Sequence, residues 1–254
     1  MEEDMTFLFV RLNALRRAFF EVNPMLKENL SFVLTVVAIF AGLALLARLA
    51  EKTICRNLRP RNAKYIAVCA MCSALAGLLM LLEIPVFFAP SFYKLDLSEL
   101  PVLFCGFCLG PVAGVICEFL KVVIKLVIKG TTTAFVGDFA NFAVGCALIL
   151  PAAIVYHLHK TRRGAVIAMI VGTLCMTVFG SAFNAFYLLP KFSQMFGLPM
   201  DVIISMGQAV NPAVQSVSTL VLFAVAPLNL LKGVLVSVLT FLLYKRVSRA
   251  VFRD

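Results

Sequence analysis

Residues 216–244 read SVSTLVLFAVAPLNLLKGVLVSVLTFLLY. The stretch is long enough for a helix to cross the ~30 Å hydrocarbon core of a bilayer, which takes about 20 mostly apolar residues. Its single charged residue is Lys232, and Lys245 and Arg246 follow directly after it. The stretch therefore predicts a membrane-spanning helix that carries a charged side chain near its middle.

The composition extends this prediction to the whole chain. Of 254 residues, 62% are hydrophobic and only 14% are charged, and the mean hydropathy is +0.99. A soluble domain carries about 25% charged residues. The net charge of +10 lies in short blocks between apolar runs. This pattern is typical of membrane proteins and does not favour nucleic-acid binding.

The apolar runs predict an all-α polytopic membrane protein. They lie at residues 30–50, 65–84, 100–109, 112–128, 136–156, 165–189 and 216–244. We expect Pro190 to close the run 165–189, and an amphipathic connection at 191–215 to follow. The predicted organisation is a tail (1–29), an additional apolar helix (30–50), a basic linker (51–64), a six-helix membrane domain (65–246) and a C-terminal tail (247–254).

The basic residues predict the orientation in the cell membrane. Thirteen Lys and Arg residues lie in the block 48–64, the block 160–163 and the C-terminal end, whereas the alternate loops hold only Lys94, Lys129 and Lys191. Because cytoplasmic loops are enriched in Lys and Arg, the C-terminus is expected in the cytoplasm. The segments 85–98, 130–133 and 191–215 then lie outside. The side of the N-terminus stays open.

Residues for catalysis or metal binding are not evident. The sequence contains no phosphate-binding loop of the form GxxxxGK[ST] and no Ser–His–Asp arrangement. The histidines, His157 and His159, lie in a basic loop that we expect to be solvated. Two cysteine pairs with C-x-x-C spacing lie within apolar runs, which favours packing over a metal site: Cys69/Cys72 and Cys105/Cys108. We expect no metal, no cofactor and no enzymatic activity.

Polar residues within the apolar runs are the strongest candidates for a binding site, because each is costly in a membrane unless it is paired or functional. Asn229 and Lys232 lie one helical turn apart, Asn184 lies near the outer end of its run, and Asp138 and Asn141 lie near the outer end of theirs. Together they predict a polar pocket that opens outward.

A second set of charges lies at three- and four-residue spacing in the run 112–128. Glu118 and Lys121 can pair along a helix, and Lys125 and Lys129 are expected to extend outward to the membrane surface. These residues are weaker candidates for function.

The loop 85–98 is expected to cover the pocket. It contains four aromatic residues, whose faces suit a flat ring: Phe87, Phe88, Phe92 and Tyr93. A site with mostly neutral amides and few charges suits an uncharged polar ring system. The residues alone thus predict a small planar solute that enters from outside.

Three separated motifs resemble one known family. They are Ala89-Pro-Ser-Phe-Tyr-Lys-Leu-Asp-Leu-Ser-Glu-Leu-Pro101, Lys129-Gly-Thr-Thr-Thr133 with Ala140-Asn-Phe142, and Ala226-Pro-Leu-Asn-Leu-Leu-Lys-Gly233. In this order they resemble the riboflavin-binding substrate-specificity subunits of energy-coupling factor (ECF) vitamin importers. The resemblance covers about residues 65–246. The first sixty or so residues have no counterpart in it.

The resemblance implies a six-helix bundle that binds riboflavin from outside as its transported substrate. It implies binding by Leu95, Asn184, Asn229 and Lys232, to which the polar pattern adds Asn141. The first outer loop would be the gate, and it contains Phe87, Phe88, Phe92, Tyr93, Lys94 and Asp96.

The resemblance also implies partners. It implies a transmembrane coupling subunit and two ATPase subunits, all assembled in the lipid membrane. Small residues on the first helix of the six would dock the coupling subunit, and Ala70 and Ala74 have the required small-xxx-small spacing. Ordinary close packing inside the bundle is the alternative interpretation of this pair.

Three other functions stay open at this stage. The same fold could bind another vitamin, such as a thiamine- or folate-like compound. The chain could be an integral-membrane enzyme, although no nucleophile–base pair or metal set supports this. It could be a structural subunit, although this would leave Asn229 and Lys232 near mid-membrane unexplained.

Overall fold

The structure is a computed structural model that describes residues 32–252 except 56–57, 59–60, 132 and 134, with side chains described as far as Tyr244. The chain forms two compact units, residues 1–42 and 43–254. An apolar helix, Phe32–Thr53, crosses this boundary and is long enough to span a membrane. It corresponds to the additional helix predicted at 30–50. The following paragraphs concern the second unit.

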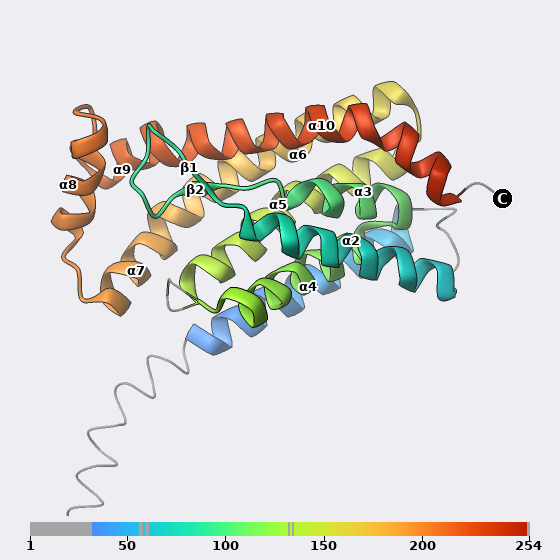
Figure 1. The fold of residues 1–254 in the computed structure, drawn as a ribbon, viewed down its shortest axis with the longest axis horizontal. Coiled ribbons are helices and arrows are strands. Elements are labelled where there is room, and N and C mark those ends of the chain that lie inside the picture. The colour runs from blue at the N-terminus through green and yellow to red at the C-terminus, as the bar shows by residue number, and fades with distance from the viewer. Residues whose placement is uncertain (1–31, 56–57, 59–60, 132, 134, 253–254) are drawn as a thin grey trace, which may run out of the picture. The chain divides into compact units, whose positions relative to one another are not determined.

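Among the described residues of this unit, six main helices form the bundle predicted from the sequence (Figure 1). They are α2 (Ala63–Leu81), α3 (Glu99–Leu109), α4 (Pro111–Lys129), α5 (Val136–Leu158), α6 (Arg162–Phe183) and α10 (Ala226–Phe252). The helices α2 and α5, α6 with its continuation, and α10 with the residues before it are long and apolar enough to span. The predicted all-α membrane fold is confirmed.

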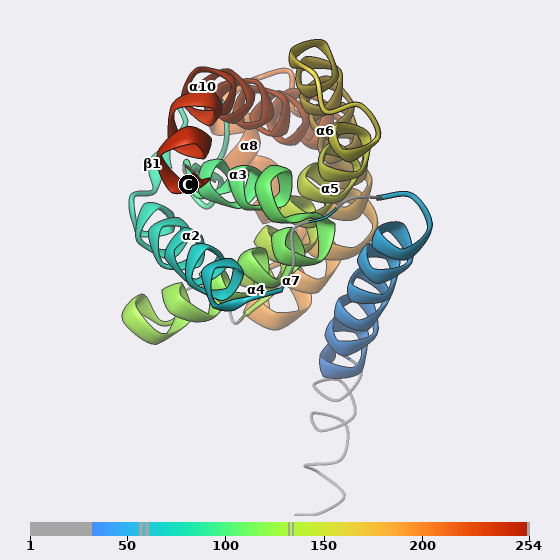
Figure 2. The ribbon, with the colours of Figure 1, turned by 90° about the vertical axis from the view of Figure 1, so that its right-hand side faces the viewer.

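Helix α3 lies in the middle of this bundle (Figure 2). All of its residues except Leu100 are buried, so a helix of 11 residues needs no lipid-facing side. Gly110 then adopts φ 116°, a left-handed conformation that favours glycine, and Pro111 begins α4. At this break the Val112 N–H donates to Glu51 Oε1 at 2.9 Å, which caps the start of α4.

The connection from α6 to α10 is more helical than the sequence suggested. Helix α6 continues through a π-helical turn, η1 (Asn184–Leu188), into α7 (Leu189–Phe196). The prediction that Pro190 closes the span is therefore wrong, because Pro190 lies in the first turn of α7, where its missing N–H is tolerated. The chain then forms α8 (Met200–Val210), α9 (Val217–Leu220) and a second π-helical turn, η2 (Val221–Val225), which leads into α10.

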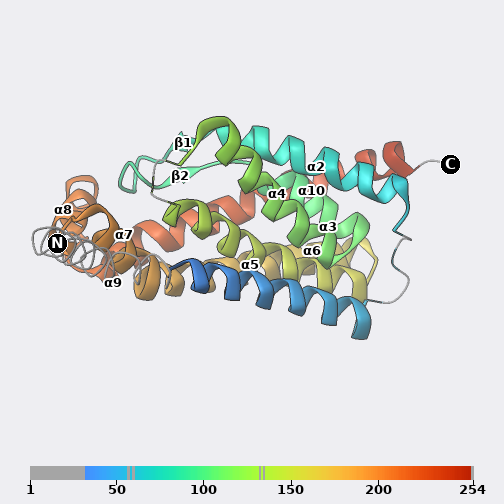
Figure 3. The ribbon, with the colours of Figure 1, turned by 90° about the horizontal axis from the view of Figure 1, so that it is seen from below.

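The loop after α2 contains a small antiparallel hairpin of β1 (Ile84–Pro85) and β2 (Lys94–Leu95). Ile84 pairs with Leu95, and Pro85 pairs with Lys94. The hairpin, α7, α8 and the α4–α5 loop lie at one end of the bundle, whereas the α5–α6 connection and the end of α10 lie at the other (Figures 1 and 3). The three predicted outer segments thus share one end.

Candidate functional site

A cavity of about 160 Å³ lies within the bundle at the hairpin end. It is lined from the hairpin loop, α3, the start of α5, η1, α7 and α10. Three predicted amides, Asn141, Asn184 and Asn229, line it together with Lys232. The structure thus brings four of the five predicted binding residues to one cavity. Leu95 lies in β2, half-buried and outside the lining, and its predicted contact stays a prediction.

The amides differ in how their hydrogen-bonding capacity is used. Asn184 accepts from the Tyr93 hydroxyl at 3.0 Å and donates to the Gly180 carbonyl at 2.8 Å. Asn229 is buried, and its Nδ2 has no hydrogen-bond partner among the described residues. A buried unpaired donor costs about 1–3 kcal/mol. A polar group of a bound solute would remove this cost.

Gly180 makes room for the Asn229 side chain. A Cβ atom at position 180 would lie 2.6 Å from Asn229 Nδ2, closer than real Cβ atoms come to other atoms. The glycine therefore lets α6 and α10 approach each other at the height of the cavity. An alanine at this position would displace the amide.

Lys232 is held by two acids that come from a distant part of the sequence. Its Nζ lies 3.0 Å from Asp96 Oδ2 and 3.2 Å from Glu99 Oε1. The chain of charges continues, because Lys121 Nζ lies 2.7 Å from Glu99 and 2.7 Å from Glu118. All five residues are buried. The ammonium group of Lys232 is thereby fixed at the cavity, between the hairpin loop and α3.

Asp96 is ionised throughout the physiological range. Burial alone would raise the pKa of its carboxyl, but the charges of Lys232 and Lys121 and the hydrogen bonds from Ser98 lower the pKa to about 2. The Ser98 N–H donates to Asp96 Oδ1 at 2.9 Å, and the Ser98 hydroxyl donates to the same oxygen. The loop is therefore joined to α10 by a charged pair.

The predicted gate residues lie in four different environments. Phe92, Tyr93 and Lys94 line the cavity, and the Phe92 ring stacks on Phe192 of α7 at 5.4 Å. Asp96 is buried in its pair with Lys232. Phe88 packs against the apolar cluster of α7–α9, whereas Phe87 is 91% exposed.

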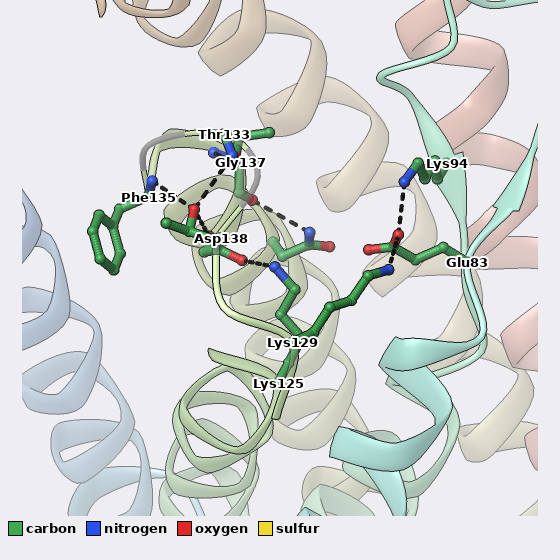
Figure 4. Close-up of polar contacts among 10 residues, drawn as sticks. Glu83, Lys94, Lys125, Lys129, Thr133, Phe135, Gly137 and Asp138 are labelled. Atoms are coloured by element: carbon green, nitrogen blue, oxygen red, sulfur yellow. Dashed lines mark hydrogen bonds and ion pairs between the residues drawn. The ribbon is translucent and has the colours of Figure 1, made fainter. Parts of the chain in front are cut away.

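A second group of charges lies at the rim of the cavity (Figure 4). Glu83 Oε2 accepts from Lys94 at 2.8 Å and from Lys129 at 2.7 Å, and thus joins the end of α2 to β2 and to the end of α4. Burial would raise the pKa of Glu83, but the hydrogen bonds from the two lysines lower it below its usual value. We call Glu83, Lys94 and Lys129 the rim cluster.

Lys125 does not extend outward as the sequence suggested. It is buried, and its Nζ lies 2.5 Å from Asp138 Oδ1 at the start of α5 (Figure 4). The Thr131 hydroxyl donates to the other oxygen of Asp138 at 2.7 Å. The prediction for Lys125 was wrong because its partner, Asp138, lies on the next helix. An ion pair satisfies a buried ammonium group better than a long path to water. The predicted Glu118–Lys121 pair is confirmed.

Several lining residues were not predicted. The most important of them is Glu99, which pairs with Lys232. It was missed because an acid at the start of a helix is usually explained by the helix dipole alone. The two π-helical turns also border the cavity, through Asn184 and Leu188 in η1 and Val225 in η2. Such turns often occur at functional sites, but no sequence signal predicts them. The other unpredicted lining residues are Thr133, Val136, Gly137, Ala140, Val144, Gly145, Met176, Leu189, Phe192 and Leu228.

The predicted docking residues face away from the bundle. Ala70 and Ala74 are exposed on α2, whereas Cys69, Cys72 and Ser73 of the same helix are buried. Packing inside the bundle, the alternative interpretation of the alanine pair, therefore does not account for them.

The predicted packing role of the cysteine pairs agrees with their burial. Among the described residues, no group of three or more His, Cys, Asp or Glu side chains is placed to hold a metal ion. His157 corrects a prediction: it lies within α5 and is buried, with Nε2 at 3.1 Å from the Gly106 carbonyl oxygen, and is not in a solvated loop.

A cavity lined by amides, aromatic rings and one fixed ammonium, inside a bundle of apolar helices, defines a membrane-embedded binding protein for a small polar solute. The family described as "ECF transporter, substrate-specific component" matches residues 64–244. The chain belongs to this family. It is accordingly a substrate-binding component of a transporter and not an enzyme.

Individual relatives agree with this assignment. The chain is 29% identical to the riboflavin transporter RibU of Staphylococcus aureus, over 76% of this chain and 95% of the relative. It is 29% identical to the riboflavin transporter FmnP of Bacillus subtilis, over 73% of this chain and 92% of the relative. A solved S component of a bacterial ECF transporter matches with a TM-score of 0.58 and 29% identity, over 75% of this chain and 98% of the other.

Proposed function

We propose that this chain binds riboflavin at the described cavity and delivers it to an energy-coupling module for ATP-driven uptake. The observation that carries the proposal is the unpaired Asn229 amide beside the Lys232 ammonium, in a cavity lined by aromatic rings. Riboflavin is uncharged and has a flat ring system edged by carbonyl and N–H groups, with a hydroxylated chain. The two riboflavin transporters among the relatives support the same ligand.

The cavity offers riboflavin partners of the right kind. Asn141, Asn184 and Asn229 can donate and accept at its ring edge and hydroxyls, and Lys232 can donate to a carbonyl. Phe92 and Phe192, which stack on each other, form an aromatic wall beside the ring. Within the described part of the chain no arginine lines the cavity, so its known lining lacks the fork geometry that proteins favour for phosphate.

The direct test is the absorption spectrum of the purified full-length protein. Bound riboflavin would give it a yellow colour, and titration by quenching of flavin fluorescence would give the affinity. Riboflavin should bind without needing a phosphate. Tighter binding of thiamine or folate, or markedly tighter binding of flavin mononucleotide, would contradict the proposed site.

The orientation belongs to the same proposal. The hairpin end would face outside and the C-terminus would lie in the cytoplasm, as the distribution of Lys and Arg indicates. A C-terminal epitope in intact cells should then react with antibody only after permeabilisation. Reaction without permeabilisation would reverse the orientation.

Coupling would use the face of α2 that points away from the bundle and carries Ala70 and Ala74. Since packing rather than the hydrophobic effect drives helix association in lipid, exposed alanines allow close approach of a coupling subunit. We expect Ala70→Leu and Ala74→Leu to keep riboflavin binding in detergent but to lose ATP-driven uptake in vesicles that contain the full transporter. Ala70→Ser and Ala74→Ser, which stay small, are the matched controls. Full uptake by both leucine variants would remove this face from the interface.

A further inference from the structure

A second cavity, of about 470 Å³, lies at the other end of the bundle, and no role has been assigned to it. Its lining residues come from the end of α3, the end of α5 with the connection to α6, the start of α6 and the later part of α10. Figure 2 shows these helices from the side of the C-terminus. It shares no lining residue with the first cavity. On α10 the two are separated by eight positions, Lys232 to Thr240, or about 12 Å of helix.

One residue that lines this cavity, Thr240, has a side-chain hydroxyl whose hydrogen-bonding capacity is unused among the described residues. Its side chain is 2% exposed, and its Oγ1 has no hydrogen-bond partner among the described residues. A threonine within a helix commonly donates to the carbonyl four residues earlier, so an unpaired buried hydroxyl is unusual. Two tyrosine hydroxyls also lie at the cavity, Tyr156 and Tyr244, 2.7 Å apart. Three side chains with hydroxyl groups therefore border the cavity, and that of Thr240 is unpaired among the described residues.

The polar side of the cavity is cationic. Lys160 and Arg162 line it, and Arg162 is the first residue of α6, whose N-cap is Thr161. The start of a helix carries a partial positive charge and directs N–H groups outward, which favours a phosphate group. Among the residues that the structure describes, no acidic side chain lines the cavity. A helix start, two cations and hydroxyl groups thus lie together.

The remaining walls are apolar. Phe107, Ala165, Met169, Phe241 and Leu242 provide them. Phe241 and Leu242 are 47% and 62% exposed on a helix that spans the membrane, so this side of the cavity is open to the hydrocarbon. A free phosphate ion would use the cations but would leave the apolar walls without a partner. A ligand with an anionic head and a hydrocarbon tail uses both.

We propose that this cavity binds an anionic phospholipid. Its phosphate lies at Lys160, Arg162 and the start of α6, its glycerol and ester oxygens meet Thr240, and an acyl chain lies along Met169 and Phe241. Basic pockets between helices at the cytoplasmic side are suited to such headgroups, and the anionic lipids are concentrated in that leaflet. This inference rests on the membrane fold and on the proposed orientation, but not on riboflavin as the substrate.

The test uses the full-length protein in detergent and native mass spectrometry with added lipids. Phosphatidylglycerol should bind and raise the unfolding temperature. Phosphatidylcholine with the same acyl chains, and inorganic phosphate alone, should do neither. Equal binding of both lipids would overturn the proposal, as would inorganic phosphate that competes fully with phosphatidylglycerol.

Variants locate the headgroup. Arg162→Gln should weaken phosphatidylglycerol binding about tenfold, the effect of losing about 1.4 kcal/mol of binding free energy. Arg163→Gln is the matched control, since Arg163 is exposed and lies outside the cavity lining. Equal losses in both variants would show general attraction to basic residues and would overturn the site. Riboflavin binding, measured by fluorescence, should be unchanged in both.

Thr240→Val separates a ligand site from a packing defect. Valine has the shape of threonine without the hydroxyl, so it should weaken lipid binding while raising the unfolding temperature of the lipid-free protein. Unchanged lipid affinity in Thr240→Val would remove Thr240 from the site and overturn this part of the proposal.

Discussion

Two lysines that line the same cavity are paired with acids at nearly the same distance and yet differ in environment. Lys232 Nζ lies 3.0 Å from Asp96, and these side chains are 7% and 6% exposed. Lys94 Nζ lies 2.8 Å from Glu83, and these side chains are 38% and 20% exposed. The first pair joins the hairpin loop to α10 within the bundle, and the second lies in the rim cluster.

The comparison teaches that the distance between two charges does not determine what the pair contributes. An exposed pair is screened by water and typically contributes about 0–1 kcal/mol. A buried pair gains little over an apolar replacement, but losing one partner leaves an unpaired charge, which costs about 3–5 kcal/mol. The inner pair is therefore a constraint on structure, whereas the rim cluster is adjustable.

The largest expected effect comes from breaking the inner pair. Lys232→Ala should weaken riboflavin binding by about 1–3 kcal/mol through the lost donor. It should also lower the free energy of unfolding by about 3–5 kcal/mol, since Asp96 stays buried without its ammonium partner, whereas Glu99 keeps Lys121. Thermal unfolding in detergent and fluorescence quenching measure the two effects.

Lys94→Ala is the control for this experiment, because it removes a lysine from the same cavity lining at an exposed position. It should change the free energy of unfolding by less than about 1 kcal/mol. Equal destabilisation in the two variants would contradict the comparison. Asn229→Ala extends the test with an uncharged residue and should weaken binding by about 1–3 kcal/mol.

A smaller effect should separate two glutamates of the inner chain. Glu99 forms ion pairs with both Lys121 and Lys232, whereas the ion pair of Glu118 is with Lys121. Glu99→Gln should therefore weaken riboflavin binding, because the Lys232 ammonium loses one of the acids that position it. Glu118→Gln should leave the affinity unchanged. Titration of both variants checks this, and equal affinities would show that Glu99 does not position Lys232.

The rim cluster should respond weakly to mutation. Glu83→Gln should lower the free energy of unfolding by less than about 1 kcal/mol, and the difference from the unmutated protein should shrink as salt is added. Thermal unfolding at low and high ionic strength measures this. A large loss that salt does not change would mean that the rim is as constrained as the interior.

The smallest effect concerns pH. The folded pKa of Asp96 is lowered from 3.8 to about 2, so the stability that its ionised form contributes is complete above pH 3.8. It is lost as the pH falls from 3.8 toward 2. Glu83 is shifted in the same direction. Riboflavin affinity should thus stay constant between about pH 5 and about pH 8. A steep change in riboflavin affinity within this pH window would show that a group other than Asp96 or Glu83 controls binding.

The sequence predicted most of the fold, because apolar runs of the length of a bilayer have few alternative structures. It also predicted that Asn229 and Lys232 line a binding pocket. Each is a polar residue within an apolar run, where it costs free energy unless it is paired or functional. It could not predict their partners. Asp96 and Lys232 are 136 positions apart, and the sequence carries no signal for that contact.

Two failures have specific physical reasons. Lys125 had two ways to satisfy its charge, and the choice of Asp138 depends on how α4 packs against α5. A proline ends most helices. Here the π-helical turn η1 shifts the hydrogen-bond register just before Pro190, and the helix continues as α7. In both cases tertiary packing, which local sequence does not specify, decided between local alternatives.

The β1–β2 hairpin has a consequence for the timing of transport. Only two residue pairs hold it among the described residues, and Pro85 in one of them has no N–H to donate. Hairpins form in about 1–10 μs, and one this short has little to break before it opens. Under the proposed coupling to ATP hydrolysis, opening of the strands is therefore too fast to limit transport. If the loop sets any rate, we expect it to be the separation of Asp96 from Lys232, so Asp96→Asn should speed release of riboflavin more than any change within the strands.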